Sequence, residues 1–134
     1  MILLWTRDLM IASSLHALSQ ATQTPVHVHS DSASLLRAID QQLSSPSAHE
    51  SAMRVPPFLV VLDLQSPGLQ VESLVPELRT RAGRQVKIVA FGPHVQTARL
   101  QASAEAGCDV VLTRGQLTSA LPDIWKQHRT GAAT

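Results

Sequence analysis

The chain has 134 residues and a formal net charge of +1, and its 11 Lys and Arg residues are scattered along the sequence. This length suffices for one domain to bury a core without disulfides, and the weak, dispersed charge argues against direct nucleic-acid binding. The single cysteine, Cys108, excludes an intramolecular disulfide and a multi-cysteine metal site. The apolar start MILLW is too short for a signal-peptide core or a membrane span, so we expect a cytoplasmic protein without membrane contact.

The first third of the chain alternates between strand and helix patterns. Ile2 to Trp5 predicts a short apolar strand, and Asp8 stands where it can cap a following helix. Pro25 to His29 alternates in the manner of a strand, and Asp31 or Ser32 can cap a second helix. The apolar residues that recur at helical spacing are Leu9, Ile11, Ala12, Leu15, Leu18 and Ala21 in the first helix, and Leu35, Leu36, Ala38 and Ile39 in the second.

Residues 44–57 interrupt this alternation. The segment is rich in Ser and Pro and has no hydrophobic period, which predicts a long surface loop before the next strand. A loop of this length inside a compact domain is either mobile or a functional insertion.

The stretch Phe58 to Gly68 (FLVVLDLQSPG) predicts the central strand, buried on both faces and ending in one acid, Asp63. Pro67 and Gly68 then turn the chain. The helix that follows places apolar residues on one face, namely Val71, Leu74, Val75 and Leu78.

A fourth strand is predicted at Val86 to Phe91, followed by an alanine-rich helix over His94 to Ala106 that stops at Gly107. Val110 to Leu112 predicts a fifth strand. Residues 130–134 should be a frayed tail.

The last helix is predicted to begin near Thr118 or Ser119. With that start, Pro122 would fall in the first turn, where proline is tolerated. The domain would therefore span residues 1–129.

Five strands alternating with five helices predict an α/β fold: a doubly wound, flavodoxin-like, five-stranded parallel sheet. Ligands of such sheets bind at the carboxyl ends of the strands. In this chain those ends carry residues 6–8, 63–66, 91–94 and 113–114. The chemistry should therefore centre on Asp63.

The order of elements, the spacing of Asp63 and Pro67, and the Ala106-Gly107 pair placed seven residues before Arg114 resemble the receiver domain of bacterial two-component response regulators. The resemblance runs from Ile2 to about His128. It implies that the central aspartate accepts a phosphoryl group and that two acids after the first strand hold Mg²⁺ with it. It also implies a Ser or Thr at the end of the fourth strand and a Lys at the end of the fifth.

The match is partial when it is carried over position by position. Asp63 stands at the acceptor position and Arg114 at the lysine position. Thr6 and Arg7 replace the acidic pair, with Asp8 displaced by one or two residues. The region of the Ser or Thr reads Ala90-Phe91-Gly92. These departures suggest a degenerate, or pseudo-receiver, site.

An arginine in place of an acid puts a fixed positive charge where Mg²⁺ would sit. We therefore predict that Asp63 pairs with Arg7, Arg114 or both, and that the site binds no metal or other cofactor. The simpler alternative is that Asp63 only caps a turn while Arg7 points to solvent and Asp8 caps a helix.

We predict that the chain is a stand-alone signalling domain, not an enzyme, that acts through contact with an unidentified protein partner or as a homodimer. One alternative keeps Asp63 as a working phosphoacceptor with Asp8 as a Mg²⁺ ligand. Another is a small-molecule sensor with a pocket near His94, which with Gly92 should lie beside Asp63.

Trp125 and Leu121 on the last helix are the predicted interface residues, because exposed aromatic side chains commonly anchor interfaces. The alternative is that Trp125 packs into the core. His27 and His29 share one side-chain direction, but without a third ligand nearby a zinc site is not expected.

Overall fold

The structure is a computed structural model that describes residues 1–43, 58–66, 69–83 and 86–131. The predicted loop at 44–57 and the end of the predicted tail, residues 132–134, lie outside the described residues. The helices and strands along the described chain are β1 (Ile2–Trp5), α1 (Leu9–Thr22), β2 (Val26–His29), α2 (Ser32–Leu43), β3 (Phe58–Asp63), α4 (Val71–Ala82), β4 (Val86–Gly92), α5 (Thr97–Ala106), β5 (Val110–Thr113) and α6 (Arg114–Gly131).

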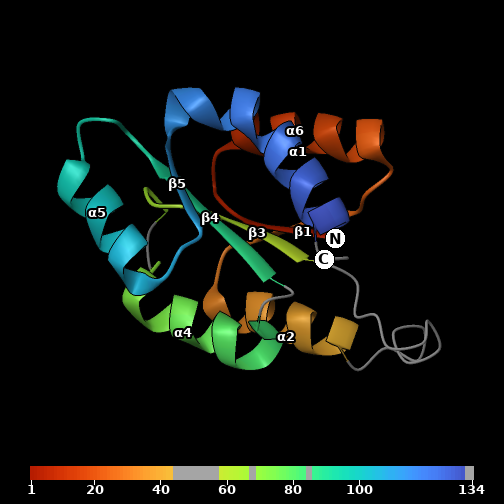
Figure 1. The fold of residues 1–134 in the computed structure, drawn as a ribbon, viewed down its shortest axis with the longest axis horizontal. Coiled ribbons are helices and arrows are strands. Elements are labelled where there is room, and N and C mark those ends of the chain that lie inside the picture. Colours follow the sequence, from red (N-terminus) through yellow and green to blue (C-terminus); the bar gives the residue numbers. More distant parts are fainter. Residues whose placement is uncertain (44–57, 67–68, 84–85, 132–134) are drawn as a thin grey trace.

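The five strands form one parallel sheet in the order β2-β1-β3-β4-β5. Figure 1 shows α1 and α6 on one face of this sheet and α2, α4 and α5 on the other. The predicted doubly wound, five-stranded parallel sheet is therefore confirmed. The order reverses direction between β1 and β3, and in such sheets the binding crevice lies at the carboxyl ends of those two strands.

The two faces of the sheet carry separate apolar cores. On the α2 and α4 side, Leu3, Trp5, Val60 and Leu62 pack against helix residues such as Leu35. The neighbouring positions in β1 and β3 point to the α1 and α6 side, because side chains alternate along a strand. The residues on this side are Ile2, Leu4, Leu59 and Val61. They pack with Ile11, Leu15, Phe91 and Leu117.

Three predicted caps are present. The Asp8 carboxylate accepts hydrogen bonds from the amides of Met10 and Ile11 at the start of α1. Asp31 accepts a bond of 2.7 Å from the Ser34 amide at the start of α2. Gly107 ends α5 with φ at 114°, a left-handed backbone that glycine adopts without strain.

The predicted starts of the last two helices are wrong. Helix α5 begins at Thr97 and not at His94, because Pro93 is followed by a turn in which its carbonyl accepts a bond of 3.0 Å from the Gln96 amide. Helix α6 begins directly after β5 at Arg114, so Pro122 lies in the helix interior and not in its first turn. The buried Leu117 anchors these early turns to the core.

Trp125 and Leu121 are core residues and not surface anchors, which corrects their assignment as interface residues. Both are 2% exposed and pack with residues of β1, β3 and α1. The Trp125 indole Nε1 donates a hydrogen bond of 3.1 Å to the hydroxyl of Thr24, just before β2. This bond satisfies the indole donor inside the protein, as a buried tryptophan requires.

Candidate functional site

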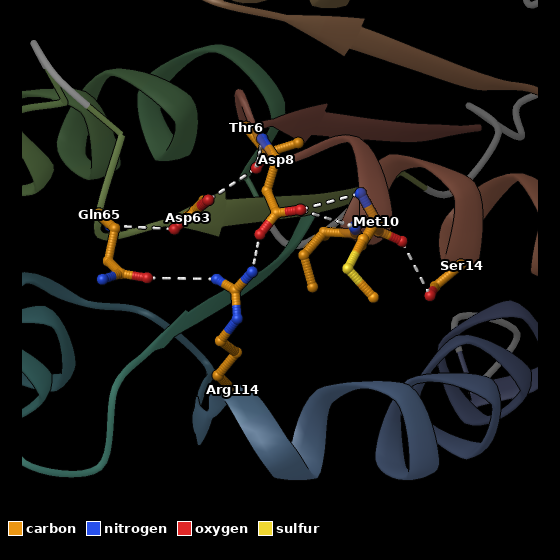
Figure 2. Close-up of polar contacts among 8 residues, drawn as sticks. Thr6, Asp8, Met10, Ser14, Asp63, Gln65 and Arg114 are labelled. Carbon is orange, nitrogen blue, oxygen red and sulfur yellow. Dashed lines mark hydrogen bonds and ion pairs between the residues drawn. The ribbon is translucent and has the colours of Figure 1, made fainter.

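Asp63 is the last residue of β3, at the carboxyl edge of the sheet, and is only 3% exposed. Both of its carboxylate oxygens accept hydrogen bonds (Figure 2). Thr6 donates its hydroxyl hydrogen to Oδ2 over 2.6 Å, and the Gln65 amide donates to Oδ1 over 3.0 Å. Asp63 therefore caps the turn after its own strand and binds the residue that follows β1.

The Thr6 hydroxyl takes part in two hydrogen bonds, one as acceptor and one as donor. It accepts a hydrogen bond of 3.0 Å from the Asp8 amide, and it donates to Asp63. Because a hydroxyl has one hydrogen, the bond accepted from Asp8 leaves that hydrogen for the carboxylate. Thr6 is 4% exposed, so the Thr6–Asp63 bond is shielded from water.

Arg114 pairs with Asp8 and not with Asp63, so the predicted Asp63–Arg114 ion pair is wrong. Its Nη2 forms an ion pair with Asp8 Oδ2, and its Nη1 donates a bond of 3.2 Å to the Gln65 side chain. Figure 2 shows the guanidinium reaching across from the start of α6 to both residues. Arg114 is therefore linked to Asp63 only indirectly, through Gln65.

Asp8 has two tasks in this arrangement. Its Oδ1 accepts the Met10 amide at 2.8 Å as the cap of α1, and its Oδ2 takes the Arg114 ion pair. The carboxylate is therefore directed at the helix and the arginine in Figure 2, while the Asp8 backbone faces Thr6.

Other predicted pocket residues contribute less. Arg7 and His94 are exposed, and His94 lies in the turn between β4 and α5. Among the described residues, Arg7 forms no ion pair with Asp63, so that part of the prediction is also wrong. Gly92 is buried, and an added Cβ would stand 3.4 Å from Leu64, at the limit of ordinary contact. The sequence reasoning missed Gln65, whose only signal was its position two residues after Asp63.

The residues around Asp63 are a poor donor set for Mg²⁺. This ion prefers octahedral oxygen coordination with one or two carboxylates. Here one carboxylate meets a hydroxyl and a peptide N–H, and the nearby Asp8 is engaged by Arg114. In the part of the chain that the structure describes, no three His, Cys, Asp or Glu residues are grouped to hold a metal ion.

This topology, with its acid at the carboxyl end of the central strand, defines the fold of response-regulator receiver domains. The receiver domain of NtrX from Brucella abortus superposes with a TM-score of 0.72 at 17% identity, over 97% of this chain and 98% of that one. The receiver domain of the sensor histidine kinase PA1611 from Pseudomonas aeruginosa, solved with a magnesium ion in its active-site cleft, gives 0.68 at 20% identity, over 97% and 96%. The chemotaxis response regulator CheY4 of Vibrio cholerae gives 0.64 at 13% identity, over 95% and 96%.

Sequence comparison adds no closer relation. No protein-family model matches the chain, and no curated protein matches it significantly. The structural likeness therefore establishes the fold. Among the described residues, no helix is both long and apolar enough to cross a membrane.

Proposed function

We propose that this chain is a degenerate receiver-like signalling domain that acts through protein contact, without catalysis and without Mg²⁺-dependent phosphorylation of Asp63. The observation that carries the proposal is the pair of bonds on Asp63. Phosphoryl transfer to a carboxylate needs a metal ion to neutralise the charge that develops, and the acceptor must be free to coordinate that ion. Here one oxygen accepts the Thr6 hydroxyl and the other accepts the Gln65 amide.

The ion pair of Asp8 with Arg114 supports the proposal. Under the alternative in which Asp63 is phosphorylated, Asp8 must leave Arg114 and the cap of α1 to become a metal ligand. That change would cost both the ion pair and the cap, and a cap alone contributes about 1 kcal/mol. The guanidinium of Arg114 balances the charge of Asp8, while Asp63 is held by two neutral donors, the Thr6 hydroxyl and the Gln65 amide.

Exposed apolar side chains favour a role in protein contact. Leu9 and Met10, in the first turn of α1, are 83% and 79% exposed, directly after Asp8. Large apolar groups next to each other on a surface are common where proteins associate. With Trp125 buried, this turn of α1 replaces α6 as the contact surface that we propose, either for another protein or for a second copy of the chain.

The decisive experiment treats the purified protein with acetyl phosphate and Mg²⁺ and measures its intact mass. We expect no phosphorylated species, and no Mg²⁺-dependent change in the NMR signals of Thr6, Asp63 and Gln65. Stoichiometric labelling that disappears in Asp63→Asn would overturn the proposal and favour the phosphorylatable alternative.

A restored site provides the positive control. The variant Thr6→Asp/Arg7→Asp returns two acids to the positions that the resemblance assigns to Mg²⁺ binding. We expect this variant to bind Mg²⁺ at millimolar concentration and to become labelled. The same variant carrying Asp63→Asn should bind the ion more weakly and accept no phosphoryl group.

A further inference from the structure

A hollow of about 310 Å³ lies between α4 and α5. Its lining residues are Leu69, Val71, Glu72, Arg99, Ala102 and Ser103. Leu69 and Val71 are 6% and 5% exposed, so they form an apolar floor. The volume is at the lower end of the range for small-molecule sites, about 300–1,000 Å³.

Two opposite charges stand at this hollow, one on each helix. Glu72 is in the first turn of α4, and Arg99 is near the start of α5. Both are exposed, and neither side chain forms a hydrogen bond or ion pair with another described residue. By contrast, the hydroxyl of Ser103 is already committed, since it donates to the Arg99 carbonyl over 3.0 Å. The charged groups that remain available are thus one carboxylate and one guanidinium.

We propose that this hollow binds a small zwitterion of the α-amino-acid class with an apolar side chain. Arg99 would receive the carboxylate, since a guanidinium binds a carboxylate through two parallel N–H donors. Glu72 would receive the ammonium group, and the side chain would lie on Leu69, Val71 and Ala102. The ligand would contact both α5 and the start of α4.

The bland explanation for Glu72 is that a carboxylate in the first turn stabilises the helix dipole of α4. That role predicts an effect on stability only. It predicts no recognition of a ligand and no involvement of Arg99, so binding measurements separate the two explanations. The proposal is also independent of the proposed function, because its test leaves Asp63 and its neighbours unchanged.

The test uses L-leucine as the probe, with amide NMR shifts and calorimetry on the full chain. We expect leucine at millimolar concentration to shift the signals of residues 69–72 and 99–103. Leucinamide lacks the carboxylate and N-acetylleucine lacks the ammonium group. Each should therefore bind at least about ten-fold more weakly than leucine. Arg99→Gln and Glu72→Gln should each lose affinity to the same degree.

Matched controls come from exposed charges elsewhere. Arg37→Gln on α2 and Glu105→Gln at the end of α5 should leave leucine binding unchanged. Ala102→Phe should fill the hollow and abolish binding while the circular-dichroism spectrum stays that of the parent. The proposal is overturned if leucine causes no shifts at the hollow, if leucinamide or N-acetylleucine binds as tightly as leucine, or if the control variants lose affinity as strongly as Arg99→Gln.

Discussion

Thr6 donates a hydrogen bond of 2.6 Å to Asp63, and both residues are at least 96% buried. They are 57 positions apart in the chain and meet because β1 and β3 are neighbours in the sheet. In the structurally similar PA1611 receiver domain, a magnesium ion is coordinated in the active-site cleft. In this chain a neutral hydroxyl donates directly to the carboxylate of Asp63. The positively charged Arg114 instead forms its ion pair with Asp8.

Replacing Thr6 by Val removes the hydroxyl while keeping the shape of the side chain. Oδ2 of Asp63 then loses its partner in a buried position, and an unsatisfied buried acceptor costs about 1–3 kcal/mol. We expect the free energy of unfolding, measured by urea denaturation, to fall by that amount at neutral pH. Thr118→Val, at an exposed position of α6, is the control and should change it by less than about 0.5 kcal/mol. A Thr6→Val change as small as the control would show that the bond contributes nothing.

Asp8 can be dissected with two substitutions. Asn retains the helix-capping oxygen but loses the charge, whereas Ala loses both. The ion pair with Arg114 is partly exposed, with side chains 27% and 38% accessible, so screening limits its contribution to about 0.2–1 kcal/mol. The cap adds about 1 kcal/mol. Asp8→Ala should therefore destabilise clearly more than Asp8→Asn.

Salt separates these two contributions to stability. The difference between the parent protein and Asp8→Asn should shrink in molar NaCl, because exposed ion pairs are screened. The difference between Asn and Ala should persist, since it reflects a hydrogen bond to the helix amides. Equal unfolding free energies for the Asn and Ala variants would contradict the capping role.

The fold was predictable because its central strands β1, β3 and β4 are nearly pure apolar runs, as in Leu59 to Leu62, which parallel sheets bury on both faces. The start of α6 was not, because Gly115 and Pro122 are both poor helix formers. Burial of Leu117 and Leu121 in the core outweighs that local preference. Tertiary packing decides such cases, and it is not visible in local sequence.

The candidate site was predictable in position but not in pairing. The acid at the end of the central strand located the site, and the position of Thr6 followed from the strand order. Arg114 pairs with Asp8 and not with Asp63. This pairing depends on how the first residue of α6 projects across the edge of the sheet. The sequence pattern placed Arg114 before the last helix, whereas it is the first residue of α6.

Trp125 tests the core position of α6. Trp125→Phe removes the bond to Thr24 but keeps most of the apolar contact, and we expect a loss of about 1–2 kcal/mol. Trp125→Ala also leaves a cavity and should cost about 3–5 kcal/mol. Leu9→Ala, at a side chain 83% exposed, should change stability little. Unfolding curves followed by circular dichroism give all three values, and a nearly neutral Trp125→Ala would argue that α6 does not pack as described.

His29, at the end of β2, makes stability depend on pH. Burial lowers the pKa of its imidazole, nearby His27 lowers it further, and Asp31 acts in the opposite direction. Its Nδ1 lies 3.0 Å from the Ser34 hydroxyl, while its Nε2 is buried without a partner among the described residues. Burial disfavours the charged imidazolium, so the folded protein favours the neutral ring.

The preference for neutral imidazole fixes the direction in which stability changes with pH. The folded pKa of His29 is below the unfolded value of 6.5, so its contribution to stability is fully present above pH 6.5 and is lost as the pH falls from there through the lower folded pKa. We expect the free energy of unfolding to decrease between pH 7 and pH 5, and His29→Gln to flatten that dependence. NMR titration of the His29 ring should give a midpoint below that of the same residue in urea. A midpoint equal to the urea value, or an unchanged pH dependence in His29→Gln, would rule out this role of His29.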